Sequence, residues 1–117
     1  MELRELVQAL LSRDTLGARQ WTADASREAV NWTDVPRPAG WSAMELAVAA
    51  GVVELFAARA RQQPPAWTAA VGSAPEPVYL VRAAETMPRL RRSCETEGPE
   101  SLRVRRIYAP PEFLTAA

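Results

Sequence analysis

The 117-residue chain contains no histidine, no lysine and only one cysteine, Cys94. Without histidine, Ser-His-Asp and Cys-His catalytic arrangements are impossible, and the commonest general base is missing. A single cysteine forms no disulfide within the chain and offers too few ligands for a zinc site. The five glycines are isolated, which excludes a glycine-rich phosphate loop. Catalysis by carboxylates alone stays open in principle, but we expect no enzymatic activity, no metal site and no cofactor.

Long hydrophobic runs are also missing, since no apolar stretch approaches the roughly 18 residues that cross a bilayer. The N-terminus is acidic and amphipathic, unlike the basic and then apolar start of a signal peptide. A lone cysteine suits a reducing compartment, so we expect a cytoplasmic protein without a membrane segment. With 48% hydrophobic residues, a chain of this length is expected to form one helical domain, residues 1–117.

Two helices are predicted at the N-terminus. Apolar residues recur with the 3.6-residue period of an amphipathic helix, at Leu3, Leu6, Val7, Leu10 and Leu11. Asp14 is a candidate N-cap for a second helix that runs to about Val30. A narrow seam at four-residue steps on that helix consists of Gly17, Trp21, Ala25 and Ala29. Pro36 and Pro38 predict a loop over residues 31–40.

The clearest local signal marks a central helix. Ser42 and Glu45 have the spacing of a capping box, in which each side chain accepts a hydrogen bond from the other residue's backbone N–H. The helix that follows is predicted to run to about Gln63, where two prolines stop it. Between residues 46 and 58 only Glu54 is charged. A helix that is apolar on every side is surrounded by other elements, so this one is predicted to be buried.

The remaining segments are shorter. A turn is predicted over residues 66–71, while the apolar run at residues 78–81 is too short to be assigned as strand or buried coil. Pro88 and Gly98 bound a further helix, and the tail is predicted to be extended at residues 107–108. The predicted fold class is therefore mostly α: a compact bundle of about five helices around the buried central helix, with a short extended C-terminal segment.

Charge balances over the whole chain but is unevenly distributed. Residues 1–81 carry seven arginines and nine acidic residues, a net charge of −2. Residues 82–117 carry seven arginines and five acidic residues, a net charge of +2. The planar guanidinium group suits carboxylate and phosphate, whereas a GC-rich genome is the simpler explanation for a chain that uses only arginine.

Six arginines in the C-terminal third are the candidate partner-binding residues: Arg89, Arg91, Arg92, Arg103, Arg105 and Arg106. If their two segments pack together, they form one basic patch able to contact phosphates or an acidic protein surface. Alternatively they are solvated and pair with Glu95, Glu97 and Glu100. The neutral charge and a pI near 6.3 weigh against a dedicated nucleic-acid-binding protein.

Three aromatic residues are added to this candidate set: Tyr108, Trp32 and Trp67. Trp32 and Trp67 lie beside proline-containing loops, and tryptophan is enriched in interface hot spots. Anchoring of those loops to the core is the alternative. Cys94 is either a reactive thiol activated by nearby arginines or a small buried hydrophobe. Its helical stripe with Met87 and Leu90 favours the buried hydrophobe.

Several segments taken together resemble a group of small, uncharacterised helical proteins of high-GC bacteria. They are ARQW at residues 18–21, VPRP at 35–38, PPAWT at 64–68, MPRLRR at 87–92 and the ending RRIYAPPEFL at 105–114. That ending is also similar to the close of helical proteins encoded beside nucleotidyltransferase-like toxins. The second resemblance implies an antitoxin role, and neither brings a catalytic residue.

The first functional hypothesis is therefore a non-enzymatic protein-binding module, antitoxin-like or regulatory, that uses the arginine-rich C-terminal surface. Weak nucleic-acid binding through the same arginines is an alternative, because phosphates attract clustered guanidinium groups. Self-association through the tail or the small-residue seam is a third hypothesis. In each case the expected partner is a macromolecule, with no membrane contact.

Overall fold

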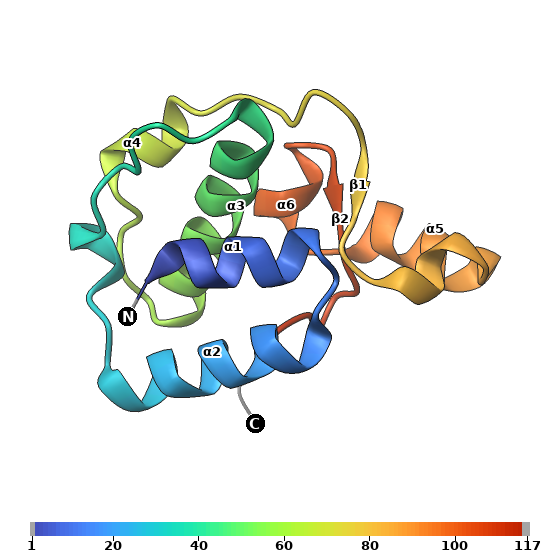
Figure 1. The fold of residues 1–117 in the computed structure, drawn as a ribbon, viewed down its shortest axis with the longest axis horizontal. Helices are drawn as coiled ribbons and strands as arrows, with labels where there is room; N and C mark the ends of the chain where they lie inside the picture. The colour runs from blue at the N-terminus through green and yellow to red at the C-terminus, as the bar shows by residue number, and fades with distance from the viewer. Residues whose placement is uncertain (1, 116–117) are drawn as a thin grey trace.

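The N-terminal part of the chain forms a helical hairpin of α1 (Leu3–Leu11) and α2 (Thr15–Glu28), as Figure 1 shows. The structure is a computed structural model that describes residues 2–115. Arg13 adopts a left-handed conformation (φ 60°) between the helices, and the Asp14 side chain accepts a hydrogen bond from Gly17 N–H at 2.9 Å. The predicted N-cap is thus confirmed.

The buried helix α3 (Ala43–Arg59) crosses the middle of the molecule (Figure 1). Its predicted capping box is present, because Ser42 N–H donates to Glu45 Oε1 at 2.9 Å and Glu45 N–H donates to Ser42 Oγ at 3.1 Å. From Ala47 to Val53 every residue is buried. The fully surrounded central helix that the sequence predicts is confirmed.

Two predicted helix ends are wrong by a few residues. The helix α3 ends at Arg59 instead of Gln63, because Arg61 turns left-handed (φ 56°) and Gln62 N–H donates back to the Ala57 carbonyl. This is the usual geometry of a helix C-terminus, with an arginine at the position that glycine often takes. Likewise α2 ends at Glu28, and Ala29 is exposed rather than part of the buried seam.

Short elements follow α3. They are α4 (Ala66–Ala69), β1 (Val78–Tyr79), a 3₁₀ turn at Arg82–Glu85, α5 (Pro88–Glu97), α6 (Glu100–Arg103) and β2 (Ile107–Tyr108). Another 3₁₀ turn, Trp32–Asp34, lies between α2 and α3. The undecided run at residues 78–81 thus begins with a strand, which pairs in parallel with β2 in the register Val78 to Ile107 and Tyr79 to Tyr108. The extended stretch predicted at residues 107–108 is confirmed.

The fold is compact and mostly helical, and its core centres on aromatic residues of three segments. Trp32 lies with its ring 5.0 Å from Phe56 and 6.3 Å from Trp21. Helix α6 packs closely on α3 because Gly51 has no side chain: a Cβ there would lie 2.5 Å from Leu102 Cδ2. In contrast α5 extends away from the body of the molecule (Figure 1), and Cys94 is its one buried residue.

Within residues 2–115, no helix has both the length and the apolar character required to cross a membrane. The longest helix is α3, with 17 residues.

The capping box predicts an acid-sensitive component of stability. The hydrogen bond from the Ser42 backbone, aided by the Ser42 hydroxyl and by Arg4, lowers the pKa of Glu45 below its ordinary value. A lowered folded-state pKa adds stability above the unfolded-state pKa, and this stability is lost as pH falls through the folded-state value. Urea unfolding of Glu45→Gln and wild type should therefore differ at neutral pH and converge under acidic conditions. An equal gap at every pH would contradict this assignment.

Candidate functional site

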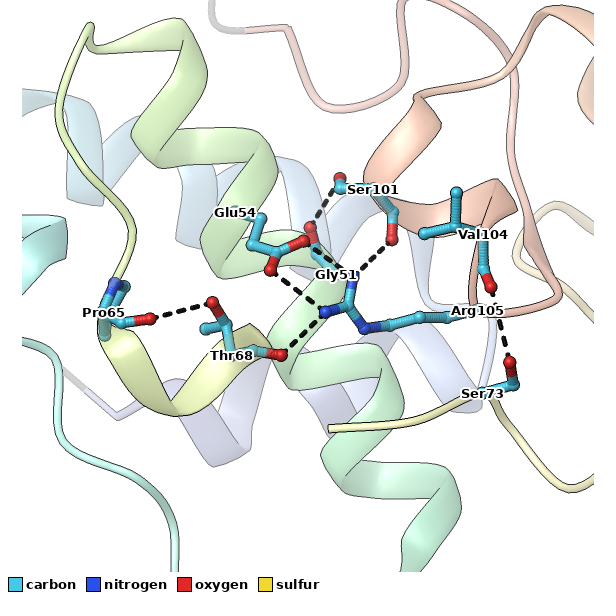
Figure 2. Close-up of polar contacts among 8 residues, drawn as sticks. All are labelled: Gly51, Glu54, Pro65, Thr68, Ser73, Ser101, Val104 and Arg105. Carbon is cyan, nitrogen blue, oxygen red and sulfur yellow. Dashed lines mark hydrogen bonds and ion pairs between the residues drawn. The ribbon is translucent and has the colours of Figure 1, made fainter. Parts of the chain in front are cut away.

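The six candidate arginines do not form one patch, because Arg105 lies in the core. Only 6% of Arg105 is exposed. Its Nη1 and Nη2 donate to the two carboxylate oxygens of Glu54 at 2.7 and 3.0 Å. Figure 2 shows the guanidinium group between α3, α4 and the turn after α6. The prediction that Arg105 contacts a partner is therefore wrong.

Backbone carbonyls complete the environment of the buried guanidinium group. Nη1 also donates to the Ser101 carbonyl at 2.9 Å, and Nη2 to the Thr68 carbonyl at 2.8 Å (Figure 2). Ser101 Oγ in turn donates to the Gly51 carbonyl at 2.9 Å. Among the described side chains, Arg105 Nε is the one fully buried polar atom without a hydrogen-bond partner. A bidentate carboxylate is what offsets the cost of burying such a cation, so this network is structural.

Arg103 and Arg106, the neighbours of this network, are engaged with nearby backbone. Arg103 is half-buried and its Nε donates to the Gly98 carbonyl at 2.6 Å. Arg106 is exposed, adopts a left-handed conformation (φ 65°) and reaches the Pro75 carbonyl at 3.4 Å. Arg106 therefore remains accessible, whereas Arg103 mainly links α6 to the end of α5.

The two candidate tryptophans anchor loops. Trp32 is buried in the aromatic core, and its backbone N–H donates to Gln62 Oε1 at 2.7 Å. Trp67 is half-buried, and its Nε1 donates to the Val35 carbonyl at 2.8 Å. For Trp32 the prediction of an exposed contact residue is wrong, because a ring held among Trp21 and Phe56 has little surface left for a partner.

Helix α5 carries the remaining three arginines, Arg89, Arg91 and Arg92, all of which are exposed. We call them the α5 basic face. Arg89 and Arg92 are three positions apart and share one side of the helix, while Arg91 lies over the Tyr79 ring. Arg89 and Arg92 form no ion pair with any residue that the structure describes, whereas Arg91 Nε lies 3.5 Å from Glu95 Oε2. Two of the three guanidinium groups are thus available to a partner.

Tyr79 of the small sheet contacts Arg91 of the α5 basic face, and Tyr108 packs against Tyr79. The Arg91 guanidinium lies 4.5 Å above the Tyr79 ring, and the Tyr79 hydroxyl donates to Glu95. Burial raises the pKa of Tyr79, and the hydrogen bond to Glu95 acts in the same direction. Tyr108, the other candidate on β2, is half-buried with its ring 5.2 Å from that of Tyr79. The small sheet therefore positions α5, and Tyr108 acts by holding Tyr79.

The order of charges along α5 is the reverse of what stabilises a helix. Its three arginines lie in the N-terminal half, while Glu95 and Glu97 lie in the C-terminal half. The helix dipole favours acidic residues at the N-terminus and basic residues at the C-terminus. The helix dipole therefore does not favour the arginines at these positions.

This charge order leads to a stability prediction. Arg89→Glu should raise the free energy of unfolding by about 0.3–1 kcal/mol at low salt, since it places an acid in the first turn of α5. Arg27→Glu is the matched control: Arg27 lies in the last turn of α2 and pairs with Asp24, so its reversal should lower stability by about as much. Chemical denaturation measures both. Two changes of the same sign would refute the dipole argument.

Cys94 has no features of a reactive thiol. It is completely buried, and burial raises its pKa, with the negative charge of Glu95 acting in the same direction. A raised pKa disfavours the thiolate, which is the nucleophilic form. Interpretation of Cys94 as a core hydrophobe is confirmed. Among residues 2–115, no three His, Cys, Asp or Glu side chains lie close enough together to hold a metal ion.

Two of the open clefts that lie away from α5 have markedly aromatic or apolar linings. One, of about 490 Å³, lies beside the end of α3, and Arg59 is the one charged residue among the described residues that line it. The other, of about 410 Å³, is lined by Trp21, Trp32, Trp41 and the loop containing Pro36 and Pro38. Neither brings together a nucleophile and a base, so neither has the composition of a catalytic centre.

These features define a compact helical domain with an aromatic core and one polar, exposed helix. No protein-family model, curated protein or solved structure matches the chain. Among the residues that the structure describes, the α5 basic face is the strongest candidate site.

Proposed function

We propose that this protein is a non-enzymatic protein-binding module that presents the α5 basic face to an acidic surface on a partner protein. The observation that carries the proposal is the position of three exposed arginines in the half of α5 where the helix dipole disfavours them. Arginine is also the residue type best suited to bidentate contacts with carboxylates.

A protein partner is favoured over nucleic acid by the charges around the site. Glu95, Glu97 and Glu100 lie on or next to the same helix and are exposed. They would repel the continuous negative charge of a phosphate backbone, whereas a protein surface can place carboxylates beside the arginines and neutral or basic groups beside these acids. Net charge is zero and the pI is near 6.3, unlike the basic surface that phosphate binding requires.

An antitoxin-like role in the cytoplasm is the specific form of this proposal, motivated by the C-terminal resemblance. In this chain, however, that ending includes five buried residues, Arg105, Ile107, Ala109, Phe113 and Leu114. The ending thus serves the packing of the domain, and the contact with a toxin or other partner would be made by the adjacent α5 basic face.

The test is affinity capture from the native host at low salt, with and without nuclease, followed by affinity measurements with the purified partner. The key variant is Arg89→Glu/Arg92→Glu, which we expect to weaken binding by about tenfold or more, equivalent to about 1.4 kcal/mol. The control is Arg19→Glu/Arg37→Glu, which changes the net charge equally at two exposed arginines distant in sequence from α5. The control should retain wild-type affinity.

Other outcomes would reject the proposal. Equal losses in the two double variants would indicate a general charge effect rather than a site on α5. A ligand that disappears on nuclease treatment, with affinity falling by about one power of salt per phosphate contacted, would identify a nucleic-acid-binding protein instead.

A further inference from the structure

We infer that α5 pairs with the α5 helix of a second copy of this chain, in an antiparallel arrangement around a two-fold axis. This inference rests on the proposed function and names a partner for the same surface. It derives from three features of α5: its exposure, its polar composition and the order of its charges.

The charges of α5 are complementary to themselves when the helix is reversed. The N-terminal half carries Arg89, Arg91 and Arg92, and the C-terminal half carries Glu95 and Glu97. Two antiparallel copies therefore place each basic half beside the acidic half of the other copy. A two-fold interface uses the same surface on both subunits, so both ion-pair sets form at once.

The exposed face of α5 is available for this contact. Cys94 marks the buried side, and at 100° per residue Arg89, Arg92 and Thr96 lie on the opposite side. All three are exposed, and residues three or four positions apart share a helix face. Glu97 is also exposed and forms no ion pair with a described residue. It lies eight positions after Arg89 and so shares a side of the helix with Arg89 through Ser93, rather than with Arg92 and Thr96. The ion pairs between the two copies therefore join Arg89 of each copy to Glu97 of the other. Free charges of both signs are thus present at the two ends of the helix.

Antiparallel pairing also reverses the unfavourable relation between the arginines and the helix dipole. Each set of arginines comes to lie beside the C-terminal end of the opposite helix, which carries partial negative charge. Likewise, Glu97 of each copy lies beside the positive N-terminal end of the other. What destabilises α5 in the isolated chain therefore stabilises the pair.

The size of α5 sets the expected strength of the dimer. Ten residues make a helix about 15 Å long, whereas stable interfaces use about 20–30 residues on each side. We therefore expect a weak dimer that forms at high protein concentration. Its dependence on ion pairs between exposed groups makes it sensitive to salt, since the Debye length falls from about 10 Å at 0.1 M to about 3 Å at 1 M.

The test uses two variants with opposite charge on α5. Arg89→Glu/Arg92→Glu makes the helix mainly acidic, and Thr96→Arg/Glu97→Arg makes it mainly basic. Both changes move the charges toward the order that the helix dipole favours, so both variants should fold. Sedimentation velocity at high concentration should show a dimer for the wild type at low salt, a monomer for each variant alone, and a restored dimer when the two variants are mixed.

The mixing experiment separates this inference from the proposed function. Wild-type protein that stays monomeric at every concentration and salt overturns the pairing, and so does a variant mixture without a heterodimer. Binding of an acidic partner protein is a separate readout, because it should be lost in Arg89→Glu/Arg92→Glu and retained in Thr96→Arg/Glu97→Arg. If the wild type is monomeric and partner binding follows this pattern, the self-pairing is rejected and the proposed function is still supported.

Discussion

Replacing Glu54 with leucine is expected to lower the free energy of unfolding by about 3–5 kcal/mol, because it leaves the Arg105 guanidinium buried without a counterion. The Arg105 side chain is only 7% exposed, compared with 22% for Glu54. The carbonyls of Ser101 and Thr68 would remain as acceptors, but they carry no full negative charge. Equilibrium unfolding in urea measures the loss.

The matched variants are Arg105→Met and the double variant Glu54→Leu/Arg105→Met. Replacing both members of a buried ion pair with apolar residues is often close to neutral. The double variant should therefore be more stable than Glu54→Leu alone, and a double-mutant cycle should give a large coupling energy. Exposed salt bridges contribute about 0–1 kcal/mol to stability. If Glu54→Leu lowers the free energy of unfolding by less than about 1 kcal/mol, the Glu54–Arg105 pair behaves like an exposed one, which contradicts its assigned role in the core.

Gly98→Ala is expected to destabilise the fold by about 3 kcal/mol, at the upper end of the usual cost of overpacking. A Cβ at this position would lie 2.3 Å from the Ala109 carbonyl oxygen and 2.6 Å from the Cys94 carbonyl oxygen. Both are backbone atoms, so relief requires the end of α5 to move away from the segment after β2 and Gly98 to move away from the last turn of α5. The backbone of Gly98 is extended (φ −62°, ψ 169°), a conformation that alanine also adopts. The cost therefore comes from the steric clash and not from backbone strain.

Cys94 provides a second readout for this variant, since displacement of α5 should expose its thiol. We expect Gly98→Ala to react faster than wild type with a thiol reagent under native conditions. The control is Gly72→Ala, where a Cβ has no heavy atom within 4 Å and φ is not positive. Its stability should be unchanged or raised by up to about 1 kcal/mol. If Gly98→Ala has the same stability and the same thiol reactivity as the wild type, then α5 is not held in place at Gly98.

Local sequence patterns were sufficient to predict the long helices. The spacing of Ser42 and Glu45 and the absence of charge around Glu54 define the start and the burial of α3 without tertiary information. The parallel pair β1 and β2 was beyond such rules, because each strand has two residues and the pairing joins segments about thirty residues apart. Only the packed structure provides that contact.

The candidate site was only partly predictable for the same reason. Clustering in sequence placed Arg105 with the exposed arginines, although burial separates them. A signal was present: Glu54 is a lone charge on a helix predicted to be buried, and a buried carboxylate requires a cationic partner. The sequence does not state which of fourteen arginines provides it. The exposure of the α5 basic face also depends on the way Gly98 and the small sheet hold the helix.

The most direct test of the account is the affinity of the Arg89→Glu/Arg92→Glu variant for the captured partner, measured beside its unfolding free energy. We predict binding at least about tenfold weaker in a domain whose stability equals or exceeds that of the wild type. Unchanged affinity in this folded variant would contradict the central claim that α5 presents the binding surface.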